Sequence, residues 1–254
     1  MLQIERLKTI ENMLDEQPAI SIADLEKALN ISRATIYRDL KVLHRQDKLH
    51  FTRGGVTRPR YASGMEQPYL IKQTTNAEQK KRIAESAVDF IKPNSTIFMD
   101  SSTTVTEMSK WLLDMKDVRV ITNDVLIAAG LSAAPGIEVI MLGGVLRKGF
   151  YTVTGLFAEQ NLSGVQIDMA FMGCDAINLA NGCMLTNMEE VALKRQVMDI
   201  SAQSIVLCDH TKFDAMAFIS FCPIDRVTYL IVGRELSEQT EQEFLEAGVD
   251  ISCV

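Results

Sequence analysis

One stretch of the chain decides the fold of its first part: Ile31-Ser32-Arg33-Ala34-Thr35-Ile36-Tyr37-Arg38-Asp39-Leu40. Ser32 is a favourable N-terminal cap for a helix, and Ile36, Leu40 and Leu43 recur at helical spacing, which predicts one buried face. Another face gathers small, aromatic and basic side chains. Such a face suits a helix in the major groove of DNA, where arginines reach base edges or phosphates; the alternative is an ordinary solvated face. The expected DNA contacts are Ser32, Arg33, Ala34, Thr35, Tyr37, Arg38, Lys41 and Arg45.

The residues before this stretch predict a second short helix. Ser21, with Asp24 three residues later, forms a capping box that opens a helix over 22–29. Asn30-Ile31 then makes a tight turn into the next helix. Two short helices, the second with a basic face, form a helix-turn-helix over about 20–39. A further helix over 3–15 is expected to support them.

A β-hairpin wing is expected after these helices. Residues 48–56 alternate apolar and polar side chains and end in Gly54-Gly55, a pair that permits a tight turn. Arg53 stands near the tip of this hairpin and is a further candidate DNA contact. Helix-turn-helix and wing together predict a winged-helix DNA-binding domain over residues 1–58.

The formal net charge of −7 is unevenly spread along the chain. Residues 31–60 carry eight Lys and Arg against two Asp, a balance of +6, which leaves −13 on the rest. A local basic patch attracts phosphates whatever the total charge, and the acidic remainder should repel DNA. We therefore expect DNA to dock at one end of the protein only.

The composition fits a soluble globular protein of one or two domains, with 254 residues, 47% of them hydrophobic and 23% charged. No apolar run reaches the roughly 18 residues of a membrane span, and the first residues lack the pattern of a signal peptide. The five cysteines are odd in number and show no CxxC spacing. We expect reduced core thiols in a cytoplasmic protein rather than disulfides or metal ligands. No cofactor and no metal site is predicted.

The second part of the chain has a different pattern. Two prolines, a glycine and mixed polar residues interrupt all periodicity over 59–76, which we interpret as a linker. From 77 to 254, apolar strands alternate with helices, and such strands predict a buried, mostly parallel sheet. The predicted fold class is therefore α/β, with an N-terminal winged helix-turn-helix domain followed by a Rossmann-like sensor domain. The strands are expected at 96–99, 118–121, 137–142, 169–172, 204–207 and 227–232.

Polar residues follow several of these strands, at the edge of a parallel sheet where ligands bind. The group 100–104 opens a helix with hydroxyl side chains, and such helix starts bind phosphate, although Ser and Thr also serve as simple caps. Lys212 suits a sugar phosphate but could equally be a surface residue. The candidate ligand-binding residues are Asp100, Ser101, Ser102, Thr103, Thr104, Thr122, Asn123, Asp175 and Lys212.

The first sixty residues resemble the DeoR family of bacterial transcription regulators. The similarity rests on Arg6 followed by Ile10 and Leu14, on Ser32-x-x-Thr35-Ile36-x-Arg38-Asp39-Leu40, and on Arg53-Gly54-Gly55. Tyr37 departs from the family, which usually has Arg or His at this position. The resemblance implies a winged helix, and the departure leaves the base contact at position 37 open.

The remainder resembles the effector domain of that family, itself similar to ribose-5-phosphate isomerase. The resemblance implies that Ser102, Thr103 and Thr104 bind a phosphate and that Asp175 and Lys212 contact a sugar. Ser102 stands where the family commonly has a glycine in that loop. The isomerases carry Asp-Gly-Ala-Asp-Glu where this chain has Met172-Gly173-Cys174-Asp175-Ala176. The groups needed for proton transfer are thus depleted.

The resemblance as a whole implies a sequence-specific DNA-binding regulator. Such a protein is usually a repressor of a carbohydrate-metabolism operon, and a phosphorylated sugar or related metabolite relieves the repression. Its expected partners are double-stranded operator DNA, the phosphorylated sugar and further copies of the chain, in a dimer or tetramer. A sugar-phosphate isomerase is the alternative, which Met172 and Ala176 disfavour.

Overall fold

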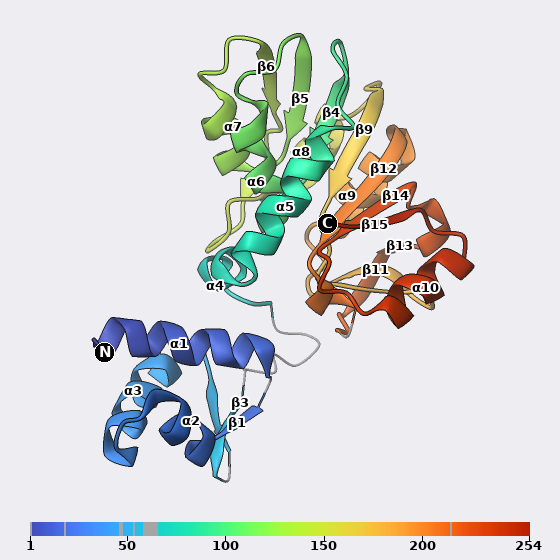
Figure 1. Ribbon diagram of the computed structural model, residues 1–254. Helices are drawn as coiled ribbons and strands as arrows, with labels where there is room; N and C mark the ends of the chain where they lie inside the picture. The colour runs from blue at the N-terminus through green and yellow to red at the C-terminus, as the bar shows by residue number, and fades with distance from the viewer. Residues whose placement is uncertain (1, 18, 46–47, 53, 58–65, 214) are drawn as a thin grey trace. The chain divides into compact units, whose positions relative to one another are not determined.

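The computed structural model describes residues 2–17, 19–45, 48–52, 54–57, 66–213 and 215–254 (Figure 1). Arg53, expected at the tip of the wing, lies outside these residues. The chain divides into two compact units, Met1–Ala62 and Ser63–Val254, and each is considered by itself. No helix in the described ranges combines the length and the apolar character that a bilayer crossing requires.

The first unit is a winged helix. Its elements are α1 (Gln3–Glu16), β1 (Ala19–Ser21), α2 (Ile22–Leu29), α3 (Arg33–Arg45), β2 (His50–Thr52) and β3 (Gly55–Thr57). Strand β1 was not predicted; it joins the two wing strands in an antiparallel sheet of order β1-β3-β2. One apolar core, with Ile10, Leu25 and Leu40 among its buried side chains, holds the three helices to this sheet.

Local sequence signals set the turn between α2 and α3. Ser21 Oγ accepts a hydrogen bond from the Asp24 backbone N–H at 3.1 Å and starts α2. Asn30 ends it in the left-handed conformation, with φ of 49°, which asparagine adopts more readily than most residues. Ser32 Oγ accepts from the Thr35 backbone N–H at 3.4 Å, so the predicted cap of α3 is present.

A seven-stranded, entirely parallel sheet forms the centre of the second unit. Its strands are β4 (Thr96–Met99), β5 (Val118–Thr122), β6 (Ile137–Met141), β9 (Ile167–Met172), β12 (Ser201–Cys208), β14 (Tyr229–Val232) and β15 (Ile251–Cys253). Their order across the sheet is β15-β14-β12-β9-β4-β5-β6. The predicted Rossmann-like α/β fold is confirmed, and the edge strand β15 adds to it.

Helices cover both faces of this sheet (Figure 1). They are α4 (Tyr69–Thr74), α5 (Ala77–Val88), α6 (Thr103–Leu112), α7 (Val125–Leu131), α8 (Leu156–Asn161), α9 (Val191–Ile200) and α10 (Glu238–Glu246). Helices α5, α6 and α7 share one core with Ile97 and Met99 of β4, whereas α8, α9 and α10 share the other with Phe98. Successive strand side chains point to opposite faces, so the unbroken apolar strands supply both cores.

Several short elements were not predicted. Strands β10 (Ala176–Asn178), β11 (Gly182–Leu185) and β13 (Ile219–Cys222) form a small antiparallel sheet, and β7 (Val145–Leu146) pairs with β8 (Val153–Thr154). Single 3-10 turns lie at His210–Lys212 and Ile224–Arg226. Helix α4 lies inside the stretch 59–76 that was interpreted as a linker. The cysteines are free thiols, with Cys183, Cys208 and Cys222 buried.

The sheet has its topological switch point between β4 and β9. From β4 the chain adds β5 and β6 on one side, then crosses to β9 on the other side of β4 and continues outward. The connections that leave the carboxyl ends of β4 and β9 therefore run in opposite directions. In open α/β sheets this is the place where ligands bind.

Candidate functional site

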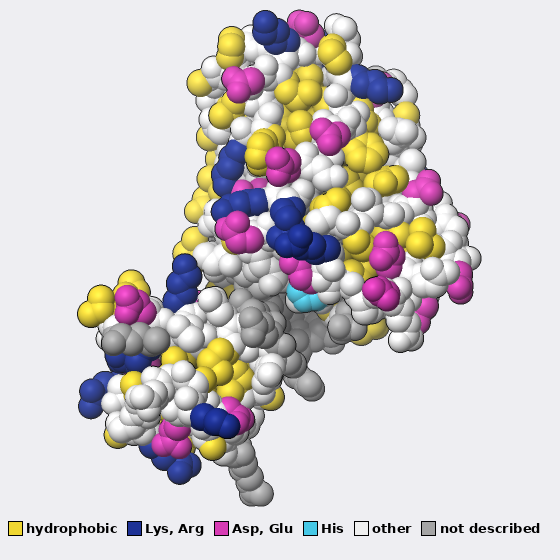
Figure 2. Space-filling view, viewed as in Figure 1, with side chains coloured by type: hydrophobic (Ala, Val, Ile, Leu, Met, Phe, Trp, Pro, Cys, Tyr) yellow, Lys and Arg dark blue, Asp and Glu magenta, His cyan; other side chains and the backbone are white. Residues whose placement is uncertain are grey.

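The outward face of α3 carries the residues expected to contact DNA. Ile36, Leu40 and Leu43 are buried in the core, which leaves the opposite face to solvent. Figure 2 shows Lys and Arg side chains on the surface of this unit around α3. The exposed residues at the start and on the outer face of the helix are Ser32, Arg33, Ala34, Tyr37, Arg38, Lys41 and Arg45, and Thr35 is partly buried.

A buried ion pair holds α3 against α1. Asp39 is fully buried, and its carboxylate accepts hydrogen bonds from Arg6 Nε at 2.6 Å, Arg6 Nη2 at 3.2 Å and Gln3 Nε2 at 3.0 Å. The hydrogen bond with Asp39 raises the pKa of Arg6 above its ordinary value. A two-pronged contact of this kind fixes orientation as well as distance, so it sets how α3, the expected recognition helix, is presented.

Tyr37 joins the recognition helix to the wing. Its ring stacks on Phe51 of β2, with the centroids 6.2 Å apart and the planes at 14°. His44 meets the same Phe51 ring edge-on at 5.3 Å. Tyr37 keeps 37% of its surface exposed, so part of the side chain remains accessible to solvent.

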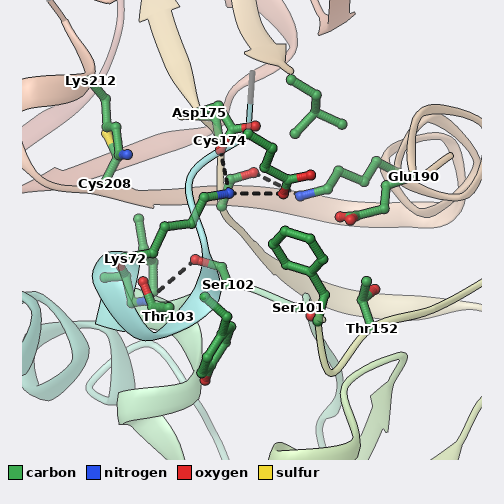
Figure 3. Close-up of a pocket in the computed structure, with 18 of the residues that line it drawn as sticks. Lys72, Ser101, Ser102, Thr103, Thr152, Cys174, Asp175, Glu190, Cys208 and Lys212 are labelled. Atoms are coloured by element: carbon green, nitrogen blue, oxygen red, sulfur yellow. Dashed lines mark hydrogen bonds and ion pairs between the residues drawn. The ribbon is translucent and has the colours of Figure 1, made fainter. Parts of the chain in front are cut away.

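The second unit holds a pocket at the topological switch point (Figure 3). Figure 3 shows Lys72 extending from the side of Ser102 and Thr103 toward Asp175. The polar and charged residues of the lining are Glu66, Tyr69, Lys72, Lys80, Ser101, Ser102, Thr103, Thr104, Thr152, Asp175, Asn187, Glu190, Lys194 and Lys212. The structure thus brings together the candidates from β4, β9 and β12.

The turn after β4 presents the start of α6 to this pocket. Ser102 Oγ caps the helix by accepting from the Thr104 backbone N–H at 3.3 Å, whereas Ser101 Oγ donates to Asp124 Oδ2 at 2.6 Å. The first N–H groups of a helix have no partner within it and carry its positive end. Gly173 allows the turn to come close, because a Cβ there would lie 2.3 Å from Ser102 Oγ.

Thr122 and Asn123 are candidate residues that do not line the pocket. Both are fully buried. Thr122 Oγ1 donates to the Met99 carbonyl at 2.6 Å. Asn123 Oδ1 accepts from the Ser101 backbone N–H at 3.2 Å, and its amide donates to Thr152 Oγ1 at 3.0 Å. The hydrogen bonds of Asn123 hold the loops that carry Ser101 and Thr152, so this buried side chain stabilises the wall of the pocket without lining it.

Asp175 is held in its charged form. Its carboxylate accepts from Lys72 Nζ at 2.9 Å and from the backbone N–H and Oγ1 of Thr186 at 2.9 and 2.7 Å. Burial opposes ionisation, but the charges of Lys72 and Lys212 outweigh it and lower the pKa of Asp175 well below its ordinary value. An ionised carboxylate accepts hydrogen bonds only, so Asp175 suits the hydroxyl groups of a ligand.

Lys194, on α9, ties the ends of β4 and β9 together. Its ammonium donates to Asp100 Oδ2 and, at 2.9 Å, to the Gly173 carbonyl. Asp100 Oδ2 also accepts from the Gly173 backbone N–H at 2.8 Å. Burial would lower the pKa of Lys194, but Asp100 and Glu190 raise it above its ordinary value. The candidate Asp100 therefore lies beneath the lining and braces it.

Sequence reasoning missed several charged pocket residues, namely Glu66, Lys72, Lys80, Glu190 and Lys194. The sequence contains a detectable pattern for two of them. Lys80 falls on the same helical face as Ile83 and Ala87, and Lys194 on the same face as Val197; a cation on an apolar stripe is unusual. Glu66 and Lys72 lie in the stretch interpreted as a linker, where no periodicity marks a pocket.

Comparisons with known proteins connect both units to one family. The DeoR-like helix-turn-helix domain matches residues 6–61, and the DeoR C terminal sensor domain matches residues 75–234. The HTH-type transcriptional repressor GlcR of Bacillus subtilis is 32% identical over 92% of this chain and 90% of its own length. The HTH-type transcriptional regulator GlpR of Haloferax volcanii is 27% identical, over 99% and 98% respectively.

Similarity to solved structures is more distant. Ribose 5-phosphate isomerase A from Neisseria gonorrhoeae covers 55% of this chain and 55% of its own, with 19% identity and a TM-score of 0.41. At that level the likeness supports no statement about activity. The family matches span a DNA-binding unit and a small-molecule sensor unit, and the full-length relatives are named as regulators rather than enzymes. This chain therefore belongs to the DeoR family of transcriptional regulators.

Proposed function

We propose that this regulator represses a carbohydrate-metabolism operon and that a phosphorylated sugar, bound in the pocket of the second unit, releases it from operator DNA. One observation carries the choice of ligand. The pocket combines the hydroxyl-lined start of α6 with four lysine side chains, Lys72, Lys80, Lys194 and Lys212. Cations and free backbone N–H groups favour a phosphate, and the carboxylate of Asp175 favours a body rich in hydroxyl groups.

The phosphate is assigned to the first turn of α6. Ser102, Thr103 and Thr104 line the pocket there, and the positive end of the helix attracts an anion. Lys212 supplies a further cation from the loop after β12. Asp175, across the pocket, is assigned to the sugar hydroxyls.

The ligand is proposed to bind without being turned over. Met172 and Ala176 stand where isomerases carry carboxylates, and both are fully buried apolar side chains. A proton-transfer step needs a base within hydrogen-bond reach of the reacting carbon. Neither residue can act as one.

DNA binding is assigned to the first unit. The exposed face of α3, with Arg33, Arg38, Lys41 and Arg45, is proposed to lie in the major groove. Arg38 and Tyr37 are the residues assigned to base edges. We further propose that the protein acts in the cytoplasm, where it meets both DNA and metabolites. The proposal that it represses transcription rather than activating it is supported by the relative that is named as a repressor.

Thr103→Val tests the assignment of the phosphate, because valine keeps the shape and removes the hydroxyl. Calorimetry with the tightest ligand from a panel of sugar phosphates should show a large loss of affinity. Thr240→Val is the matched control, since Thr240 lies in the first turn of α10, which does not line the pocket. Equal affinities for wild type and Thr103→Val would move the ligand elsewhere, and conversion of the ligand by wild type would point to an enzyme.

A further inference from the structure

The carboxylate of Glu66 lies inside the pocket and is bound there by three donors. Lys72 Nζ donates to Glu66 Oε1 at 2.9 Å, Arg147 Nη2 donates to Oε2 at 2.7 Å, and Asn187 Nδ2 donates to Oε2 at 3.0 Å. Only 14% of the Glu66 side chain is exposed. A glutamate thus occupies a cluster of donors that would suit the anionic group of a ligand.

The donors come from three separate parts of the second unit. Lys72 is on α4, Arg147 directly follows β7, and Asn187 lies between β11 and α9. Phe150 packs against both cations, with its ring centroid 5.7 Å from Lys72 Nζ and 4.5 Å from Arg147 Cζ. Contacts of this kind stabilise cations on an aromatic face. The cluster is therefore built by the fold and does not depend on Glu66 alone.

The cluster is separate from the start of α6. Ser102, Thr103 and Thr104 are not among the partners of Glu66, which are Lys72, Arg147 and Asn187. Lys72 connects the two regions, because its ammonium also donates to Asp175 at 2.9 Å. Lys72 and Asn187 line the pocket, whereas Arg147 does not line it and reaches it through its contact with Glu66. The pocket thus offers two places for negative charge, one at the helix start and one at the position of the Glu66 carboxylate.

We propose that Lys72, Arg147 and Asn187 form a second anion subsite, that Glu66 fills it in the ligand-free protein, and that a ligand with two anionic groups displaces Glu66. The inference rests on the proposed function in one respect, namely that the first anionic group is the phosphate at α6. The ligand class is then a sugar phosphate whose other end carries a second phosphate or a carboxylate.

The charges around Arg147 favour exchange. Arg147 contacts the carboxyl groups of Glu66, Glu189 and Glu190, so one cation is shared by three acidic side chains. Burial raises the pKa of Glu190 to about 7. The three acidic side chains outweigh burial and raise the pKa of Arg147 above its ordinary value. Loss of Glu66 leaves Arg147 with two partners, while a planar guanidinium binds an incoming phosphate or carboxylate in the same two-pronged way.

Glu66 stands near the start of the second unit, which begins at Ser63. It precedes α4 and follows the residues that lead from the DNA-binding unit along the chain. Release of its carboxylate frees the chain just before α4. Ligand binding would thus act directly on the described residues 66–68 that precede α4.

The test counts anions bound per chain in the full-length protein, with inorganic phosphate as the probe in calorimetric titrations. Glu66→Ala should bind one phosphate more than wild type, because the vacant subsite accepts it. Glu189→Ala is the matched control: it also removes a carboxylate from Arg147, but Glu189 is 63% exposed and does not line the pocket. It should bind as many phosphates as wild type. Equal counts for wild type and Glu66→Ala would overturn the inference.

Two further variants keep the result interpretable. Glu66→Gln preserves the size of the side chain without its charge and should also gain a phosphate, which guards against misfolding of Glu66→Ala. Adding Arg147→Ala to Glu66→Ala should remove the extra phosphate. A retained extra phosphate would place it outside the proposed subsite and contradict the inference. If wild type binds no phosphate while Glu66→Ala binds one, the subsite stands and the assignment to α6 fails.

Ligand panels then identify the second group. Sugar bisphosphates and phosphorylated sugar acids should bind Glu66→Ala more tightly than wild type, whereas a sugar with a single phosphate should bind both equally. A gain confined to bisphosphates would identify a phosphate, and a gain confined to sugar acids a carboxylate. No gain for either class would contradict displacement of Glu66.

Discussion

Asp39 is a single carboxylate on which the presentation of the recognition helix depends. It is fully buried, and Arg6 and Gln3 satisfy it. Removing Asp39 takes away the acceptor of three hydrogen bonds from Arg6 and Gln3, and one hydrogen bond to a charged group contributes about 1.5–3 kcal/mol. We expect Asp39→Ala to lower the free energy of unfolding of the first unit by about 3 kcal/mol. Urea unfolding measures this loss. Arg38→Ala, at the neighbouring exposed position, is the control and should leave the free energy of unfolding unchanged. Equal free energies of unfolding for the two variants would refute the role of the ion pair.

Lys80 predicts a pH dependence of ligand binding. Burial lowers the pKa of Lys80 to about 8, so the side chain is charged at pH 7 and neutral at pH 9. A sugar phosphate is fully ionised at both, since its second pKa is about 6. Affinity should therefore fall as pH rises through 8, on the order of tenfold, which corresponds to about 1.4 kcal/mol. Glu190 also lines the pocket, and burial raises its pKa to about 7, so its ionisation adds to the fall in every variant. Calorimetry at the two pH values should therefore show a larger fall in wild type than in Lys80→Met; an equal fall in both would assign it to another group.

The sequence predicted some pocket residues and missed others for physical reasons. Ser102, Thr103 and Asp175 lie three or four residues beyond the ends of β4 and β9, so the carboxyl edge of the sheet had to bring them together. Glu66 and Lys72 come from a stretch without periodicity, and only their contacts with Arg147 and Asp175 make them part of the site. Such contacts between distant parts of the chain leave no local pattern.

At the scale of elements, helix α3 is proposed to carry DNA recognition. Its apolar side is buried and Arg38 is exposed on the other side. Arg38→Ala should weaken operator binding by about 1–3 kcal/mol, the discrimination that one good base contact supplies, while the unfolding curve stays unchanged. Gel-shift titration at fixed salt measures the affinity. Unchanged binding would mean that α3 is not inserted into the groove as proposed.

Long apolar elements were easier to predict than short ones. The strands β4 and β9 are buried over most of their length, which produces apolar runs in the sequence, such as residues 97–99 and 169–172. In contrast, β7 and β8 have two residues each, too few to show alternation. The sheet of β10, β11 and β13 depends on pairing across many residues, as between Cys183 and Cys222. Helix α4 is similarly short, at six residues.

At the scale of the whole molecule, one winged helix makes few base contacts, and specific sites usually pair two half-sites one helical turn apart. The second unit also exposes Leu156 and Phe157 of α8 and Val145 of β7, and exposed apolar groups of this kind mark interaction surfaces. We expect an oligomer, at least a dimer. Light scattering should give a protein mass at least twice the 28.3 kDa of one chain. A protein mass of 28.3 kDa, both for the free protein and for the protein part of its DNA complex, would refute this.

The central claim is that a ligand in the pocket of the second unit controls DNA binding by the first. Its most direct test is fluorescence anisotropy of operator DNA, identified by selection from random sequences, with the full-length protein and the tightest sugar phosphate. Saturating ligand should lower the DNA affinity of wild type by about 5–150-fold, the usual range of coupling between sites. Thr103→Val should bind DNA equally well with and without the ligand. Contradiction would come from a wild type that binds the ligand yet holds DNA unchanged, or from a Thr103→Val protein released from DNA as readily as wild type.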